Sequence, residues 1–312
     1  MDRNLALEFV RVTEAAAIEA AHWIGKGEGK KADGAAVEAM RQRFNTIDFH
    51  GRIVIGEGKK DEAPELYVGE ELGTGNGPEM DIAVDPLECT DSVAFGRYNA
   101  TTLITTGPRG SLLSAPDTYM EKIAVGPMAR SVIDLGAPIK VNIENVAKAL
   151  GKEVSEITVS MLDRPRHAEM IKEVREAGAR IRLITDGDVA VAVATCQEKS
   201  PIDMLLGSGG SAEAVLAAVA VKILGGEILV RLKPRNDSDR NEMAEMGLDD
   251  KTIFSSEDLA KGDHLTFTAT GVIDGPMLPG VIFKPNTILT HSVVMRSISK
   301  TVRYLTTHHH EE

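Results

Sequence analysis

Residues 81–91 read D-I-A-V-D-P-L-E-C-T-D, and the rest of the chain can be interpreted around this stretch. The apolar run at 82–84 predicts a short buried strand. Pro86 has no N–H and a fixed φ, so we expect regular pairing to end there. Four polar side chains crowd the turn that follows: Asp85, Glu88, Thr90 and Asp91. Clustered carboxylates favour a bound cation such as Mg²⁺ or Mn²⁺, although most motifs of this kind are ordinary polar loops.

The composition of the chain limits the classes of protein it can belong to. Its 312 residues are 43% hydrophobic but only 4% aromatic, so aliphatic side chains must fill the core. A net charge of −12 argues against a nucleic-acid or membrane-surface partner. The two cysteines, Cys89 and Cys196, provide neither a disulfide framework nor a zinc pattern. Without an apolar signal core or a long apolar run, the sequence predicts a cytoplasmic protein.

The order of the predicted elements favours two domains, residues 1–130 and 131–312. Helical periodicity at 5–24 and 35–44 precedes strand-like stretches at 52–55, 94–107, 111–115 and 121–125, which predicts a metal-binding α+β domain with a mainly antiparallel sheet. Three later strands, at 157–162, 180–184 and 204–206, alternate with helices and predict a mainly parallel α/β domain that binds substrate. Late strands within 264–305 can join either sheet. We expect a loop at 233–250 and a disordered tail at 308–312.

Polar residues follow the strands of the predicted parallel sheet, where ligands bind in such folds. These residues are Arg164 and Arg166, Asp186 and Asp188, and the stretch Gly207–Glu213. The glycine loop at 207–210 can direct N–H groups at a phosphate, but it has neither the lysine of an ATP-binding loop nor dinucleotide-binding spacing. Glu213, in the first turn of a helix, is explained equally well by a favourable interaction with the helix dipole.

Five acidic residues stand at the ends of predicted elements: Asp33, Glu57, Asp85, Glu88 and Glu213. A lone acid such as Asp33 is more often a helix cap or turn residue than a metal ligand. Together with two arginines, however, the set suits metal-assisted hydrolysis of a phosphate ester by two divalent ions about 3.5–4 Å apart. Thr90 could then orient or deprotonate the attacking water through a neighbouring carboxylate.

These motifs resemble those of a known enzyme superfamily. D-P-L-E-C-T at 85–90 resembles the D-P-[IL]-[DE]-G-T motif of the lithium-sensitive, metal-dependent sugar and inositol phosphatases, and I-G-E-G at 55–58 resembles their first metal-ligand motif. The wider pattern, over about residues 5–225, resembles class II fructose-1,6-bisphosphatase. It comprises R-V-T-E-A-A-A (11–17), A-D-G-A-A-V-E-A-M-R (32–41), I-V-I-G-E-G-K-K-D-E-A-P (53–64), A-P-D-T-Y-M-E-K (115–122), R-P-R-H (164–167), D-G-D-V-A (186–190) and G-S-G-G-S-A-E (207–213).

The resemblance implies a fold, an activity and cofactors. The fold would be the layered α-β-α-β-α arrangement of the sugar phosphatases. The reaction would remove the 1-phosphate of fructose 1,6-bisphosphate in gluconeogenesis, and some relatives also accept sedoheptulose 1,7-bisphosphate. Two or more Mn²⁺ or Mg²⁺ ions would occupy each active site. A subunit of this size with apolar late strands is also expected to form a homodimer or homotetramer.

The resemblance also assigns roles to individual residues. Asp33 and Glu57 match ligands of one metal, and Asp85, Glu88 and Glu213 match ligands of the second. Thr90 matches the water-activating threonine, and Asp61 matches an acid needed for catalysis. The matched substrate contacts are Glu88, Cys89, Thr90, Tyr119, Arg164, Pro165, Arg166, Asp186, Gly187, Asp188 and Gly210.

Two departures from the family pattern leave alternatives open. Cys89 replaces the usual glycine of the motif, which is unfavourable if this position needs φ > 0. Gly29 stands where relatives often carry a basic residue, although Lys30 or Lys31 could substitute. One alternative is a related phosphatase acting on an inositol phosphate. The other is a catalytically weakened relative that binds metal and phosphosugar without efficient turnover.

Overall fold

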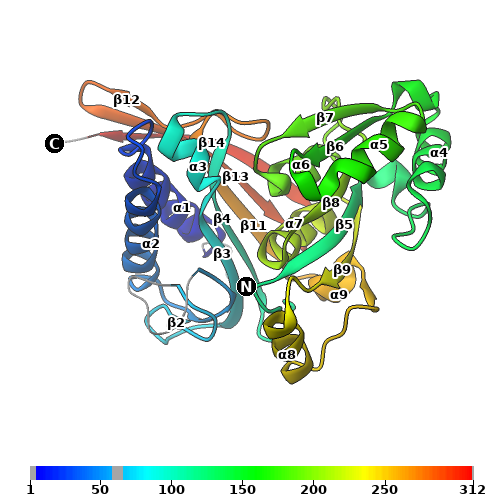
Figure 1. Ribbon diagram of the computed structural model, residues 1–312. Coiled ribbons are helices and arrows are strands. Elements are labelled where there is room, and N and C mark those ends of the chain that lie inside the picture. Colours follow the sequence, from blue (N-terminus) through cyan, green and yellow to red (C-terminus); the bar gives the residue numbers. More distant parts are fainter. Residues whose placement is uncertain (1–4, 58–65, 311–312) are drawn as a thin grey trace. The chain divides into compact units, whose positions relative to one another are not determined.

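The computed structural model describes residues 5–57 and 66–310, which form two compact units (Figure 1). The first unit comprises Met1–Ser114 and Gly262–Glu312, and the second comprises Ala115–Lys261. The domain limits expected from the sequence, 1–130 and 131–312, stay a prediction.

The first unit is built on an eight-stranded sheet in the order β12-β13-β11-β4-β3-β1-β2, with β14 paired to β13. Among the strands that the structure describes in this sheet, β1 and β3 pair in parallel and the other pairs are antiparallel. The strands are β1 (His50–Ile55), β2 (Glu71–Leu72), β3 (Glu79–Glu88), β4 (Ala100–Pro108), β11 (Thr266–Ile273), β12 (Ile282–Lys284), β13 (Thr287–Arg296) and β14 (Thr301–His310). The late strands therefore join the first sheet.

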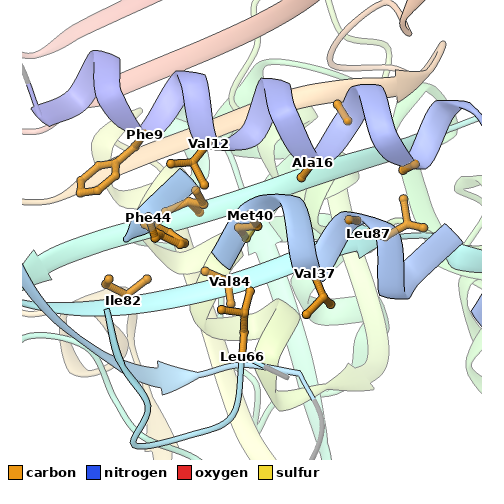
Figure 2. Close-up of a cluster of buried hydrophobic side chains, with 14 of the residues drawn as sticks. Phe9, Val12, Ala16, Val37, Met40, Phe44, Leu66, Ile82, Val84 and Leu87 are labelled. Atoms are coloured by element: carbon orange, nitrogen blue, oxygen red, sulfur yellow. The ribbon is translucent and has the colours of Figure 1, made fainter. Parts of the chain in front are cut away.

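Helices α1 (Leu5–Ala21) and α2 (Gly29–Phe44) cover this sheet, and the short α3 (Thr90–Phe95) follows β3. Their apolar faces meet the strands in one core, where the rings of Phe9, Phe44 and Phe49 pack edge-on or tilted with centroids 5.5–6.0 Å apart. Figure 2 shows the side chains of Phe9, Phe44 and Ile82 in the layer between the two helices and β3. Burying three aromatic rings together partly offsets the low aromatic content of the chain.

The second unit contains a six-stranded sheet in the order β10-β9-β5-β8-β6-β7. Strands β6, β7 and β8 pair in parallel, as the alternation of strands and helices predicts, whereas β5, β9 and β10 complete the sheet with antiparallel pairs. The strands are β5 (Tyr119–Val125), β6 (Thr158–Leu162), β7 (Arg180–Ile184), β8 (Met204–Gly210), β9 (Glu227–Lys233) and β10 (Ile253–Phe254).

Helices pack on both faces of the second sheet. Helices α4 (Ile139–Leu150) and α5 (Ala168–Glu176) bury their apolar sides against alternate residues of β5, β6 and β8. The opposite face carries α6 (Asp188–Ala194) and α7 (Ser211–Ile223), with the shorter α9 (Ser256–Leu259) beside α7. Helix α8 (Asp237–Glu245) and three 3-10 turns complete the unit: Pro127–Ala129, Val154–Glu156 and Pro165–His167. Two mixed sheets with their helices confirm the expected mixed α/β fold class.

Several local predictions are wrong in informative ways. The stretch 94–99, assigned to a strand, instead contains the end of α3 and a turn, and 111–115 is not a strand. The polar stretch 233–250 contains α8, because the side chain of Asn236 caps it by accepting the Asp239 N–H. The end of the chain to His310 belongs to β14, where cross-strand pairing with β13 orders a polar sequence. In the described part of the chain, no helix has the length and apolar character needed to cross a membrane.

Candidate active site

A β-bulge at Pro86 shapes the acidic turn of the first unit. β3 does not end at Pro86, as the sequence suggested, but its register with β4 shifts between Asp85, opposite Leu103, and Glu88, opposite Thr101. One extra residue on β3 bends the strand and re-aims its side chains. The Asp85 carboxylate accepts the backbone N–H of Leu87 at 3.1 Å, and the buried Glu88 accepts the Thr101 hydroxyl at 3.1 Å.

The parallel register of β1 and β3 places two of the predicted metal ligands level with each other. Ile55 pairs with Ala83, and Glu57 and Asp85 each lie two residues beyond this pair. Neighbouring strands run about 4.8 Å apart, so both acids stand at the same edge of the sheet. Both residues follow predicted strands in the sequence, and the register brings these two strand ends together.

A backbone bridge to Leu66 fixes the backbone at Glu57. The Glu57 N–H donates to the Leu66 carbonyl at 2.9 Å, and the two residues form an antiparallel bridge. Gly56 leaves no room for a side chain, since a Cβ there would lie 1.9 Å from the Leu66 oxygen. Asp61 lies within 58–65, outside the described residues, so its role stays a prediction.

Asp33 lies on α2, not in the preceding loop, because the helix begins at Gly29 rather than at residue 35. Burial raises the pKa of the Asp33 carboxyl above its ordinary value. The same helix packs closely on α3: a Cβ at Gly29 would lie 3.3 Å from Thr90 Cγ2 and 3.5 Å from Ala94 Cβ. The missing side chain at Gly29 therefore permits close contact with Thr90. The nearby Lys31 pairs with Glu28.

Cys89 and Thr90 join the bulge to α3. Cys89 has φ 72° and ψ 47°, the left-handed conformation that the motif's usual glycine adopts without strain. Its sulfur lies 3.8 Å from Asn99 Nδ2, and its side chain packs against the first unit's core. The Thr90 hydroxyl donates to the Leu87 carbonyl at 3.0 Å, which leaves its oxygen lone pairs as acceptors.

In the second unit, the expected substrate contacts gather where β6, β7 and β8 end. Arg164, after β6, forms a 2.5 Å ion pair with Asp186, after β7. Gly187 has φ 87° at the start of α6, a conformation that favours glycine. Because the carboxyl ends of parallel strands meet at one sheet edge, the separate motifs of the sequence become one polar surface.

Arg166 and Tyr119 approach each other at this same edge. Tyr119 begins β5 and pairs in register with Gly210, the last residue of β8. The Arg166 guanidinium stacks over the Tyr119 ring, 4.6 Å from its centroid. The Nε and Nη2 atoms of Arg166 both donate to the Ser208 carbonyl, at 3.2 and 2.8 Å. Pro165 begins the short 3-10 turn that carries Arg166.

A buried lysine that the sequence reasoning did not single out underlies this surface. Lys122, only 2% exposed, donates to the Asp188 carboxylate at 2.7 Å and to the Gly210 carbonyl at 3.2 Å. Burial raises the pKa of Glu213, and the charge of Asp188 adds to the increase while Lys122 opposes it. A Cβ at Gly210 would lie 2.1 Å from Glu213 Oε2. Lys122 could have been noticed as the one basic residue in the strand Y-M-E-K-I-A-V.

The chemistry of the acidic residues fits a hard divalent cation. Their donor atoms are all carboxylate oxygens, and a cation would favour the ionised forms of Asp33 and Glu213, whose pKa values burial raises. Within residues 5–57 and 66–310, no three His, Cys, Asp or Glu side chains are already arranged as a metal cluster. Glu213 belongs to the second unit and the other four acids to the first: Asp33, Glu57, Asp85 and Glu88. Ligation by these five residues stays a prediction.

Comparison with known proteins covers the whole chain. The model of the family described as bacterial fructose-1,6-bisphosphatase, glpX-encoded, matches residues 3–309. The chain belongs to this family. It is 43% identical, over 99% of its length and 96% of theirs, to fructose-1,6-bisphosphatase 1 class 2 of Escherichia coli K12 and to the class 2 enzymes of Escherichia coli O6:H1 and Shigella flexneri.

A solved structure, an extragenic suppressor from Pyrococcus furiosus, has a TM-score of 0.30 and 14% identity over 60% of this chain and 68% of that one.

Class 2 fructose-1,6-bisphosphatases are hydrolases of gluconeogenesis, and metal dependence is general among them. The class 2 family therefore confirms the resemblance in the motifs, including the activity expected from it.

The left-handed conformation of Cys89 predicts that this residue lowers stability. We expect Cys89→Gly to raise the free energy of unfolding by about 0.5–1 kcal/mol, because glycine removes the backbone strain and only part of that gain is lost with the cysteine's packing. Cys89→Ala is the matched control, since it loses the packing but keeps the strain. Urea unfolding measures both variants. A Cys89→Gly protein no more stable than Cys89→Ala would contradict the prediction.

His167 predicts a dependence of stability on pH. Burial, helped by the charges of Arg166 and Lys233, lowers the pKa of His167 below its ordinary value of 6.5, so the folded protein holds it neutral. The unfolded chain takes up this proton below pH 6.5, and the stabilising contribution is lost as pH falls from there toward the folded pKa. Between pH 7.5 and 5.5, the free energy of unfolding of wild type should fall by up to about 1 kcal/mol more than that of His167→Asn, as measured by urea unfolding. Equal losses in the two proteins would refute this assignment.

Proposed function

We propose that this chain hydrolyses the 1-phosphate ester of fructose 1,6-bisphosphate in the cytoplasm, as a homodimer or homotetramer, with two or more Mn²⁺ or Mg²⁺ ions in each site. The full-length match to class 2 enzymes carries this proposal. The placement of the matched motif residues at the edges of the two sheets supports it. Sedoheptulose 1,7-bisphosphate is a second candidate substrate of the same kind.

The second unit offers groups that suit a phosphorylated sugar. Arginine guanidinium groups bind phosphate with a planar fork, and Arg164 and Arg166 are each held by a partner within the protein. Asp186 and Asp188 can accept hydrogen bonds from sugar hydroxyls, and Tyr119 provides an aromatic face beside them. Pro165, Gly187 and Gly210 contribute backbone groups at the same edge of the sheet.

The first unit offers groups that suit the reacting phosphate. Glu88, Cys89 and Thr90 form the turn that would face it, where the bulge bends the chain. The Thr90 hydroxyl, which donates to Leu87, can accept a hydrogen bond from the attacking water and so orient it. Asp61 would act as the acid needed for catalysis.

Asp33 and Glu57 would hold one divalent ion, and Asp85, Glu88 and Glu213 the second. When bound, such ions supply a nucleophilic hydroxide at neutral pH and neutralise the charge that develops on the phosphoryl group. The protein's own contribution is to keep the carboxylates ionised and in place. Lys122 does so near Glu213, and the Thr101 hydroxyl does so at Glu88.

A substrate panel tests this function directly. We expect the purified full-length protein, supplied with Mn²⁺ or Mg²⁺, to release inorganic phosphate from fructose 1,6-bisphosphate faster than from inositol 1-phosphate or fructose 6-phosphate. Chelation with EDTA should abolish release, and added metal should restore it. Faster release from inositol 1-phosphate would move the proposal to the related class of substrate. Sugar-bisphosphate binding without turnover would identify a weakened relative.

Removal of the carboxylate of Glu57 or of Asp85 tests the metal assignment. We expect Glu57→Ala and Asp85→Ala each to reduce kcat at least about 10²-fold while leaving the far-ultraviolet circular dichroism and urea midpoint near wild type. Glu79→Ala is the control, because this residue begins the same strand as Asp85 and its side chain is 66% exposed. Full activity in either test variant would exclude that residue as a metal ligand.

A further inference from the structure

Both backbone polar groups of Ser208, its N–H and its C=O, are bound by the R-P-R-H segment. His167, which is fully buried, lies with Nε2 2.9 Å from the Ser208 N atom and 3.1 Å from its Oγ atom. Its Nδ1 atom lies 2.8 Å from the Leu162 carbonyl, at the end of β6. Arg166 meanwhile donates twice to the Ser208 carbonyl. Two consecutive side chains after β6 thus hold one residue of β8.

These contacts fix the protonation state of His167. Because the Ser208 N–H can only donate, Nε2 must accept, and the single ring proton lies on Nδ1 and donates to Leu162. The site also has little free space: Gly207 has φ 149°, and a Cβ there would lie 3.3 Å from ring atoms of His167. A neutral imidazole therefore joins the end of β6 to the backbone of β8.

The position of Arg166 depends on this link. Arg166 is an exposed side chain, and an untethered arginine loses rotamer entropy when it is ordered. Its guanidinium is ordered by the Ser208 carbonyl and the Tyr119 ring. The N–H of the same residue is held by His167. Releasing that N–H would free the acceptor that orients Arg166.

We propose that His167 is a positioning residue, which fixes Ser208 so that Arg166 is pre-oriented for the sugar bisphosphate. It does not itself touch the substrate. The inference rests on the proposed function, because Arg166 is proposed there as a phosphate contact. A purely structural histidine would affect stability alone, and this difference makes the proposal testable.

Two conservative substitutions separate the two hydrogen bonds of the ring. The His167→Asn amide can still reach the Leu162 carbonyl but is too short to accept the Ser208 N–H, whereas the longer His167→Gln side chain can accept that N–H and loses Leu162. We expect His167→Asn to raise KM for fructose 1,6-bisphosphate about 10-fold with kcat within about 3-fold, as loss of one positioning hydrogen bond implies. His167→Gln should stay within about 3-fold of wild type in both constants.

Gly207→Ala also disturbs the contact between His167 and Ser208, and it replaces His167→Asn in this test if that variant does not fold. Its Cβ would press on the imidazole, so it should also raise KM more than it lowers kcat. If folded His167→Asn or Gly207→Ala lowers only the urea midpoint, or lowers kcat with KM unchanged, the positioning role is refuted.

A double-variant cycle tests whether His167 acts through Arg166. We expect His167→Asn combined with Arg166→Ala to have the same KM as Arg166→Ala alone, because no arginine remains to be positioned. Multiplicative effects on KM would show that His167 acts independently and would overturn the inference. Wild type that releases no phosphate from fructose 1,6-bisphosphate would instead refute the proposed function. An active wild type with an unaltered Arg166→Ala variant would remove the premise of the inference and leave the activity intact.

Discussion

The extra residue that β3 inserts at Pro86 is the constraint on which the first unit's acidic turn depends. Proline cannot donate to the ladder, so β3 loses its register with β4 and bends between Asp85 and Glu88. The bend turns Glu88 toward the Thr101 hydroxyl and forces Cys89 into the left-handed region. A helix then starts at once, at Thr90. Strand, bulge and helix together place several polar groups within one short segment, which regular structure could not do.

The second unit holds a buried pair of opposite charges at the end of its sheet. Lys122 and Asp188 are almost fully buried, and a single buried charge would cost several kcal/mol. The pair is tolerated because the lysine also binds the Gly210 carbonyl and stands near Glu213, so its charge serves more than one group. A well-packed apolar pair could be as stable, but it would leave the Gly210 carbonyl and Glu213 without the lysine. The ion pair is therefore better understood as support for the polar edge than as a source of stability.

The fold class followed from the sequence because its evidence is local. The strands β6, β7 and β8 alternate with helices over short distances, and the periodicity of α1 is visible in its own residues. What could not be predicted depends on distant partners. β14 is ordered only by pairing with β13, and β5 joins the second sheet through β8 and β9, strands more than 75 residues away. Helix α8 was missed for another reason, because its polar composition hides a capped turn that starts at Asn236.

The candidate site divides in the same way. Acids and arginines at strand ends could be found by their residue types, and the parallel register of β1 and β3 then explains why Glu57 and Asp85 have similar settings. Residues that act by supporting others were missed, although Lys122 and His167 both lie within quoted motifs, because a motif does not show which of its members support the rest. Their importance depends on which backbone atoms they meet, such as the Gly210 carbonyl and the Ser208 N–H.

The choice of histidine beside an arginine follows from electrostatics. A residue that must accept the Ser208 N–H cannot be a lysine or arginine, which only donate. A carboxylate could accept it, but its charge would pair with Arg166 and compete with an anionic ligand for the guanidinium. An imidazole kept neutral by burial accepts the N–H and leaves the charge of Arg166 uncompensated. The neighbouring cations Arg166 and Lys233 reinforce that state, because they oppose a further positive charge on the ring. The arginine that would bind phosphate thus helps to keep neutral the residue that orients it.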